Sequence, residues 1–293
     1  MALLELKDLH TFFRTKKGIV KAVNGVSYSV EAGRTLGVVG ESGSGKSVSA
    51  MSILQLLDGN GYIDSGEILF EGRDLTKLTE KEMYSVRGND ISVIFQEPMT
   101  SLNPVFTVSR QVSEPFIIHQ GMTKKQAAAK VIEMLADVKI PNPHIVAKQY
   151  PHQLSGGMRQ RVMIAIAFAC DPKILICDEP TTALDVTIQG QILDIIKNLQ
   201  KKNQTSVIMI THDLGVVANI AQKIAVMYSG IIVESGTCED IFYRPRHPYT
   251  WALIRSVPRL DLKNKQELAT IPGTPPDLLN PPVGCPFCTR CSY

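Results

Sequence analysis

Eight residues near the N-terminus have the types and spacing of a phosphate-binding loop. The segment from Gly40 to Ser47 reads GESGSGKS and fits the pattern G-x-x-x-x-G-K-[ST]. Its glycines let the backbone curl so that N–H groups point at phosphate oxygens, and the helix start adds a favourable dipole. We expect Lys46 to reach the β- and γ-phosphates of a nucleotide and Ser47 to bind Mg²⁺. The predicted nucleotide contacts in the loop are Gly40, Glu41, Ser42, Gly43, Ser44, Gly45, Lys46 and Ser47.

A second chemical feature is a pair of carboxylates at the end of an apolar run. Residues 174–177 read ILIC and are followed directly by Asp178 and Glu179. At the carboxyl end of a parallel strand such a pair faces the ligand crevice. Asp178 is then placed to hold Mg²⁺, and Glu179 to polarise an attacking water. Taken alone, the pair also fits a surface turn before Pro180, but the phosphate loop in the same chain favours the catalytic interpretation.

The elements that position these residues are short strands alternating with helices. Four apolar runs without strict alternation, at 35–39, 91–95, 174–177 and 207–210, predict strands buried on both faces of a parallel sheet. Apolar residues at helical spacing predict helices over 127–138 and 188–199. The alternation predicts an α/β fold with a parallel sheet. Residues 1–39 read as β-rich.

Composition limits the function classes. The chain has 293 residues, 44% of them hydrophobic, which excludes a disordered protein. A net charge of +3 and 6% aromatic residues argue against a dedicated nucleic-acid coat. The most apolar run, 162–170, is too short to span a membrane and predicts a buried helix. The N-terminus lacks a signal-peptide pattern, so we expect the six cysteines to be reduced in the cytosol.

Five further motifs follow the phosphate loop in a specific order. They are Gln96 after the strand at 91–95, LSGGMRQ at 154–160, the acidic pair, ALD at 183–185 and His212. With Phe13, or its rival Phe12, as an aromatic before the loop, this set resembles the ATP-binding cassette (ABC) ATPases over about residues 4–235. The resemblance implies a P-loop ABC ATPase with a RecA-like parallel sheet core, an N-terminal β subdomain and an inserted α-helical subdomain over about 97–154.

The same resemblance implies a role for each matching residue. Lys46, Glu179 and His212 are the expected catalytic residues, and ATP and Mg²⁺ are the expected ligands. The metal would be held by Ser47, Gln96 and Asp178, Phe13 would lie under adenine, and Asp185 would belong to the D-loop. The signature residues, which would close on ATP bound by a partner subunit, are Leu154, Ser155, Gly156, Gly157, Met158 and Gln160. A complete site then needs two ATPase domains.

A narrower resemblance rests on the segment at Gln96, which matches the Q-loop of the ABC ATPases, together with segments in the signature and the C-terminal tail. Four segments together look like the ATPase subunits of bacterial dipeptide and oligopeptide importers: QEPMTSLNP at 96–104, LSGGMRQR at 154–161, RHPYT at 246–250, and GCPF at 284–287 followed by Arg290 and Cys291. This implies an ABC domain over 1–235 and a C-terminal extension over 236–293. The proline-rich part of the extension, 245–293, holds nine of the seventeen prolines and should be loop-rich.

The importer resemblance also implies partners and a location. They are a second ABC ATPase subunit, expected to be a different chain, two transmembrane permeases, and indirectly an extracytoplasmic peptide-binding protein, with no nucleic acid. The chain would be peripheral on the cytoplasmic face of the cell membrane. The alternatives are an ATPase for nickel or another small solute, a soluble ABC ATPase acting on nucleic acid or ribosomes, and a regulator that binds ATP without hydrolysing it. The intact Glu179 and His212 argue against the last.

Three of the six cysteines crowd the end of the chain. Cys285, Cys288 and Cys291 have a spacing that suits a [4Fe–4S] cluster or zinc, and the importer resemblance implies an iron–sulfur cluster in this tail. A fourth ligand would have to come from a distant cysteine or another chain. The alternative is three reduced thiols. Cys170 and Cys177 read as core residues.

Overall fold

The computed structural model describes residues 2–182, 184–256 and 271–293. Its contacts divide the chain into two compact units. Unit 1 comprises Met1–Glu31, Thr35–Leu78 and Met209–Tyr293, and unit 2 comprises Ala32–Arg34 and Thr79–Ile208. One boundary between the units falls within the fully buried strand β8 (Ser206–Thr211), so residues 206–208 belong to unit 2 and residues 209–211 to unit 1.

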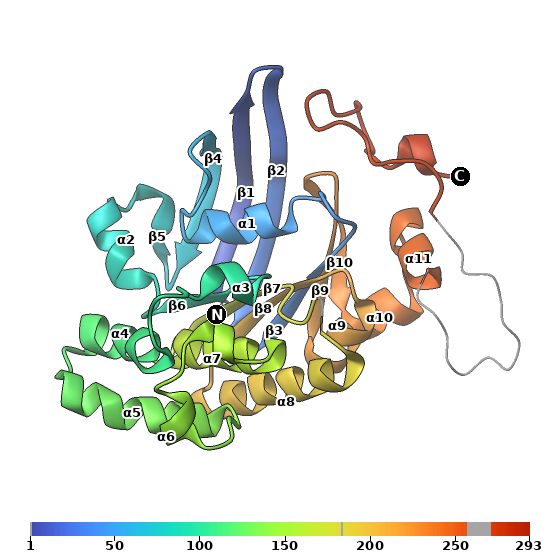
Figure 1. The fold of residues 1–293 in the computed structure, drawn as a ribbon. Coiled ribbons are helices and arrows are strands. Elements are labelled where there is room, and N and C mark those ends of the chain that lie inside the picture. Colours follow the sequence, from blue (N-terminus) through green and yellow to red (C-terminus); the bar gives the residue numbers. More distant parts are fainter. Residues whose placement is uncertain (1, 183, 257–270) are drawn as a thin grey trace, which may run out of the picture. The chain divides into compact units, whose positions relative to one another are not determined.

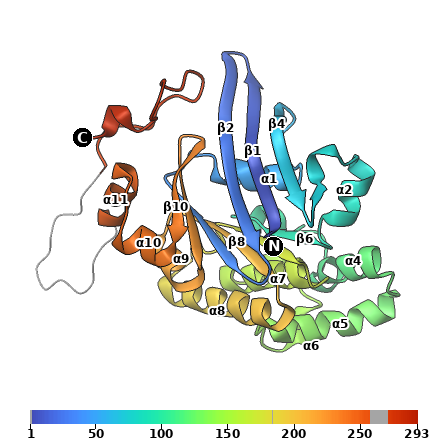
Figure 2. The same cartoon turned by 180° about the vertical axis from the view of Figure 1, so that it is seen from behind.

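Unit 1 contains an antiparallel sheet with the strand order β2-β1-β4-β5. Its two long first strands form the hairpin that Figures 1 and 2 show beside β4, with Phe13 paired to Gly61. Alternating apolar residues place one face of β1 in the core, where Leu4, Leu6 and Leu9 are at most 2% exposed. The predicted β-rich N-terminus is confirmed. The strands are β1 (Ala2–Thr15), β2 (Gly18–Glu31), β4 (Gly61–Phe70) and β5 (Arg73–Asp74).

Unit 1 also holds the strand that leads into the phosphate loop and two strands that follow much later in the sequence. Strand β3 (Thr35–Val39) is buried at every residue and pairs in parallel with β9 (Lys223–Tyr228), which pairs antiparallel with β10 (Ile231–Thr237). The strand predicted over 35–39 is therefore confirmed. The helices of the unit are α1 (Lys46–Ile53), η1 (Leu75–Lys77), α9 (Leu214–Ile220), α10 (Cys238–Tyr243), α11 (Pro248–Arg255) and η3 (Cys288–Arg290). As predicted, the described part of 245–293 is mainly loop.

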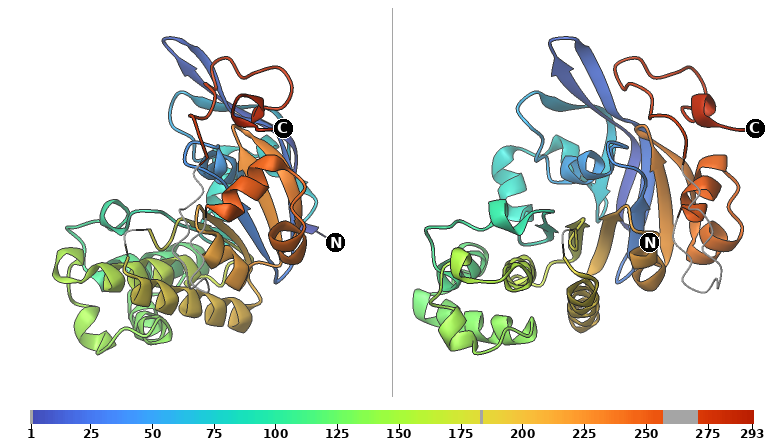
Figure 3. Two further views of the ribbon diagram at one scale, coloured as in Figure 1. Left: turned by 90° about the vertical axis from the view of Figure 1, so that its right-hand side faces the viewer. Right: turned by 45° about the vertical axis from the view of Figure 1, so that its right-hand side comes forward.

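Unit 2 combines a parallel strand pair with a group of helices, drawn in green and olive in Figure 3. Strands β6 (Ile91–Ile94) and β7 (Ile174–Asp178) pair in parallel, which confirms the expected sheet type. The helices predicted over 127–138 and 188–199 lie within α5 and α8, apart from Val138, the C-cap of α5. The helices of the unit are α2 (Glu80–Val86), α3 (Pro98–Ser101), α4 (Val108–Gln120), α5 (Lys124–Asp137), α6 (Pro143–Val146), η2 (Pro151–Gln153), α7 (Gly156–Phe168) and α8 (Val186–Asn203).

Side-chain caps explain why the helices of unit 2 begin where they do. The Thr123 hydroxyl accepts from the Gln126 N–H, and the Gln126 side chain accepts from the Thr123 N–H, so a capping box starts α5. Helix α8 begins after Asp185, and α7 begins after Ser155. The buried helix predicted at 162–170 is the apolar second half of α7, which ends at Phe168.

Candidate active site

The loop between β3 and α1 has the tight backbone that phosphate binding requires. Gly45 is the N-cap of α1 with φ 96°, and a Cβ at this position would lie 2.2 Å from the Ala22 carbonyl oxygen. Only glycine fits both conditions, so the pattern is enforced by the packing of the loop against β2. The predicted loop residues follow this course: Ser42 and Gly43 are exposed, Glu41 and Ser47 are half-buried, and Gly40, Ser44, Gly45 and Lys46 are buried.

The side chain of Lys46 lies along the loop that is predicted to hold phosphate. Its Nζ donates to the carbonyl oxygens of Gly40 and Glu41, both at 2.8 Å, and the residue is only 5% exposed. Ser44 Oγ is buried and has no hydrogen-bond partner among the described residues. A buried ammonium and an unsatisfied hydroxyl in one glycine-rich loop form a site suited to an anion.

The acidic turn after β7 brings two predicted residues together. Gln96, which follows β6, donates from Nε2 to Glu179 Oε2 at 3.1 Å. The Thr182 hydroxyl donates to the same oxygen at 2.9 Å. Glu179 has φ 46°, a left-handed conformation that is uncommon outside glycine. Asp178, the last residue of β7, is 7% exposed. Sequence reasoning missed Thr182, whose only signal is a hydroxyl three residues after the acid.

The predicted signature residues form the N-terminus of α7. Ser155 is the N-cap, and its hydroxyl accepts from the Met158 N–H at 3.3 Å. Ser155 and Gly156 are exposed and Gly157 and Met158 are half-buried, so the helix start, with its favourable dipole, is open to an anion.

The other two signature residues point inward. Leu154 is 3% exposed, and Gln160 is 1% exposed. The Gln160 side chain donates to the Pro180 carbonyl oxygen at 2.6 Å. This bond ties α7 to the acidic turn within unit 2, a positioning role that the spacing alone did not reveal.

Asp185, predicted for the D-loop, and His212, a predicted catalytic residue, lie at the ends of secondary-structure elements. Asp185 is exposed and accepts at its carboxylate from the Ile188 N–H at 3.0 Å, which caps α8; Ala183 lies outside the described residues. His212 is exposed directly after β8. The next residue, Asp213, caps α9 by accepting from two N–H groups. Asp185 and Asp213 therefore fix where α8 and α9 begin.

The two candidate aromatics lie on opposite faces of β1. Phe12 makes edge contacts with the Tyr62 ring at 6.3 Å. Phe13 lies two residues after Thr11, whose hydroxyl is 2.8 Å from Ser52 Oγ in α1. Because side chains two apart share a face, Phe13 is on the face of the sheet that receives the helix of the phosphate loop. This placement favours Phe13 over Phe12 as the nucleotide contact.

Comparison with known proteins identifies the family. The sequence pattern of the ABC transporter family matches residues 23–182, more than half of the chain. The chain belongs to the ABC transporter family. It is therefore an ATP hydrolase of the ABC type, and its nucleotide is ATP. The pattern described as the oligopeptide/dipeptide transporter C-terminal region matches residues 233–293.

Individual relatives of this ABC ATPase agree with the assignment. The chain is 56% identical to the oligopeptide transport ATP-binding protein OppD of Bacillus subtilis over 99% of its length and 82% of that protein. It is also 56% identical to the dipeptide transport ATP-binding protein DppD of the same organism, over 98% and 86%. Its fold matches the dimeric cassette MJ0796 bound to ADP and Pi with a TM-score of 0.72, at 27% identity, over 80% of this chain and 98% of that one.

The cysteines at the end of the chain do not form a metal-binding group. Within the described residues, no three His, Cys, Asp or Glu side chains are arranged to hold a metal ion. Cys288 is exposed, Cys291 packs beside the apolar cluster that contains Phe287, and Cys285 Sγ lies 3.7 Å from His247 Nε2. These residues do not fit an iron–sulfur cluster or a zinc site, and the predicted cluster has no support.

The remaining cysteines are packed in the fold. Burial raises the pKa of the Cys177 and Cys238 thiols, and it raises the pKa of Cys170 to about 11. All three therefore stay protonated near neutral pH, in line with the core role expected of Cys170 and Cys177.

In the described part of the chain, no helix combines the length and the apolar character that crossing a membrane requires.

Proposed function

We propose that this chain is the ATPase subunit that energises import of dipeptides or oligopeptides across a bacterial cytoplasmic membrane. The observation that carries the proposal is the pairing of an ABC ATPase with the oligopeptide/dipeptide transporter C-terminal region in one chain. Relatives at 56% identity are named for oligopeptide and dipeptide transport. The exact cargo is then chosen by the permeases and by an extracytoplasmic binding protein.

In this proposal the phosphate loop binds MgATP. Lys46 exchanges its two carbonyl partners for phosphate oxygens, which neutralises charge on the nucleotide. Ser47, Gln96 and Asp178 supply the oxygen ligands that Mg²⁺ prefers. Phe13 stacks under adenine.

Hydrolysis uses Glu179 and His212. Glu179 accepts a proton from the attacking water, while His212 donates a hydrogen bond to the γ-phosphate as charge develops on it. The open start of α7 binds the γ-phosphate held by a partner cassette, with Ser155 and the N–H groups of Gly156 and Gly157 as donors. Closure of two cassettes on ATP is the step that drives the permeases, and hydrolysis resets them.

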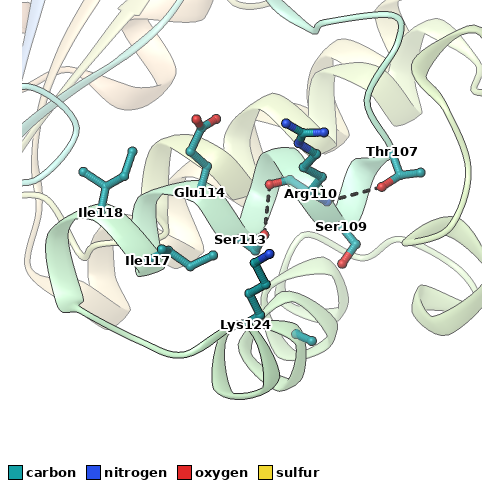
Figure 4. A pocket seen from close by; sticks show the side chains of 9 residues that line it. Thr107, Ser109, Arg110, Ser113, Glu114, Ile117, Ile118 and Lys124 are labelled. Carbon is teal, nitrogen blue, oxygen red and sulfur yellow. Dashed lines mark hydrogen bonds between the residues drawn. The ribbon is translucent and has the colours of Figure 1, made fainter.

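A surface on the helices of unit 2 suits contact with the permeases. A groove of about 630 Å³ lies over α4 and α5. Figure 4 shows the side chains that line it. The apolar side chains of Ile117 and Ile118 share it with the charges of Arg110, Glu114 and Lys124. We infer that it receives a short amphipathic helix of a permease, since such a helix presents both kinds of side chain. The chain would thus be held at the cytoplasmic membrane face by its partners.

The test is affinity purification of the chain from detergent-solubilised native membranes, with mass spectrometry of the proteins that accompany it. The proposal predicts two polytopic permeases and a second ABC ATPase of different sequence. A peptide-uptake assay with the Lys46→Ala variant should show no ATP-driven import. Recovery with ribosomes or nucleic acid and no membrane protein would overturn the proposal. Recovery with a nickel-binding protein would indicate that the cargo is nickel and not peptide.

A further inference from the structure

The C-terminal extension reaches the phosphate loop through one arginine. Within unit 1, Arg290 Nη1 donates to Glu41 Oε2 at 2.7 Å, and Arg290 Nη2 donates to Glu41 Oε1 at 3.1 Å. This is the two-pronged geometry of a guanidinium on a carboxylate, which fixes direction as well as distance. Glu41 is the second residue of the phosphate loop, and Arg290 lies 249 residues further along the chain.

The guanidinium of Arg290 uses all of its donors in hydrogen bonds. A guanidinium carries five N–H groups, and five acceptors surround this one. Besides the two carboxylate oxygens of Glu41, they are the Tyr228 hydroxyl at 3.2 Å, the Pro272 carbonyl at 2.8 Å and the Ile271 carbonyl at 3.2 Å. Its side chain is only 4% exposed. Such complete satisfaction of a buried charge indicates a built contact rather than a chance surface pair.

A second residue of the extension holds the main chain of the same glutamate. The Tyr249 hydroxyl, on α11, accepts from the Glu41 N–H at 2.8 Å. The Tyr249 ring is fully buried and packs on the Tyr228 and Phe287 rings, with centroids 4.5 and 5.4 Å away. Glu41 is thus fixed at its carboxylate and at its N–H by side chains from two different segments of the tail.

Lys46 contacts the same residue, Glu41, that the extension holds. The Glu41 carbonyl oxygen accepts from Lys46 Nζ at 2.8 Å. The ammonium group that is proposed to bind phosphate is therefore in contact with the residue that the extension holds. We propose that Arg290 and Tyr249 are positioning residues that hold Glu41 and thereby set the affinity of the phosphate loop for ATP. The inference rests on the proposed role of this loop in ATP binding. A loop held in its binding conformation loses less freedom when the nucleotide arrives.

The experiment measures ATP affinity of the full chain with a fluorescent ATP analogue, alongside the KM and kcat of hydrolysis. Arg290→Gln should raise the dissociation constant and the KM about tenfold and leave kcat nearly unchanged, and Glu41→Gln should raise the dissociation constant to the same extent. The double variant should be no weaker than either single variant, because the two side chains act as one pair.

Two further variants separate positioning from folding. Tyr249→Phe removes only the hydroxyl and keeps the packed ring, so it should weaken ATP binding while thermal unfolding shows an intact fold. Arg244→Gln is the matched control, since Arg244 is exposed and its partner Glu239 lies 3.9 Å away at the surface. Wild-type affinity in Arg290→Gln and Tyr249→Phe, with both variants folded, would overturn the inference. Lys46→Ala separates the two proposals: if it too leaves binding unchanged, the loop's role in ATP binding fails, whereas loss of binding in Lys46→Ala alone leaves that role standing.

Discussion

Glu179 is held by two side chains in a backbone conformation that few residues other than glycine adopt. A left-handed conformation outside glycine costs on the order of 1–3 kcal/mol and is found most often where function requires it. Gln96 and Thr182 both direct hydrogen bonds at the same carboxylate oxygen, Glu179 Oε2. These contacts fix the position of the carboxylate that is proposed to act as the general base.

The first prediction concerns Glu179→Gln. The amide cannot accept a proton, so the rate of phosphate release should fall by about 10²- to 10⁴-fold. ATP should stay bound, because Lys46 and the loop are unchanged, and it should remain with the protein through gel filtration. Glu133→Gln in the exposed Lys130 pair of α5 is the control and should hydrolyse ATP normally. Unchanged turnover in Glu179→Gln would remove Glu179 from the mechanism.

At the residue scale the sequence predicted chemical types better than contacts. Gln96 and Glu179 are 83 residues apart, and each was identified from its own motif. The hydrogen bond between them depends on β6 and β7 being neighbours, which follows from three-dimensional pairing and not from spacing. Gln160 shows the same limit, because its buried bond to Pro180 requires α7 to pack against the acidic turn.

Among the elements, α7 serves two purposes through one residue. The Ser155 hydroxyl caps the helix, and the same N-terminus is the proposed site for the partner's γ-phosphate. Two substitutions separate these roles. Ser155→Ala loses the cap and should lower the free energy of unfolding by about 1 kcal/mol. Ser155→Asp keeps a capping oxygen and should retain stability, but its charge repels phosphate and should abolish hydrolysis of the ATP held by the partner's phosphate loop.

The measurements are urea unfolding and steady-state hydrolysis for the two variants side by side. Stability and activity should separate, with Ser155→Asp folded yet with a lower rate of hydrolysis in the assembled transporter. If Ser155→Asp hydrolysed ATP at the wild-type rate in the assembled transporter, the start of α7 would not approach a phosphate.

The groove over α4 and α5 gives a prediction about coupling. Ala128 lines the groove and is exposed, so Ala128→Trp should fill it and weaken co-purification with the permeases. ATP binding by the isolated chain should be unaffected. Ala129→Trp places the same bulk on the next exposed position of α5, which does not line the groove, and serves as the control. Equal permease recovery with both variants would place the docking surface elsewhere.

The strands were predictable because each buried run is short, apolar and bounded by turn signals. The run 35–39 matches β3 at both ends, and β7 extends the predicted run only by Asp178. Helix α4 was less accessible from sequence, since Pro115 lies inside it and proline ordinarily ends a helix. Its buried residues Val108, Val112 and Phe116 keep the helical spacing through the proline.

At the scale of the whole chain, the tail is the part that sequence reasoning understood least. The cysteines drew attention to metal chemistry, while the contact that ties the tail to the phosphate loop is made by Arg290 and Tyr249. Both residues belong to segments that carry the importer resemblance, but their contacts were not predictable, because partners 208 and 249 residues apart leave no local pattern. The tail is thereby connected to ATP binding and not only to assembly.

One chain supplies one phosphate loop and one signature, so the last prediction concerns how sites are shared in the assembled transporter. If each ATP lies between two different cassettes, Lys46→Ala disables the site at this chain's loop, and Ser155→Asp disables the site at the partner's loop. Each single variant should then retain one occluded ATP per assembly, and the chain with both substitutions should retain none. Nucleotide trapped by the purified complex gives the count directly. One ATP retained in all three assemblies would mean that each site is complete within its own chain, whereas none in either single variant would indicate a dimer of identical chains, since a symmetric pair carries each substitution in both sites.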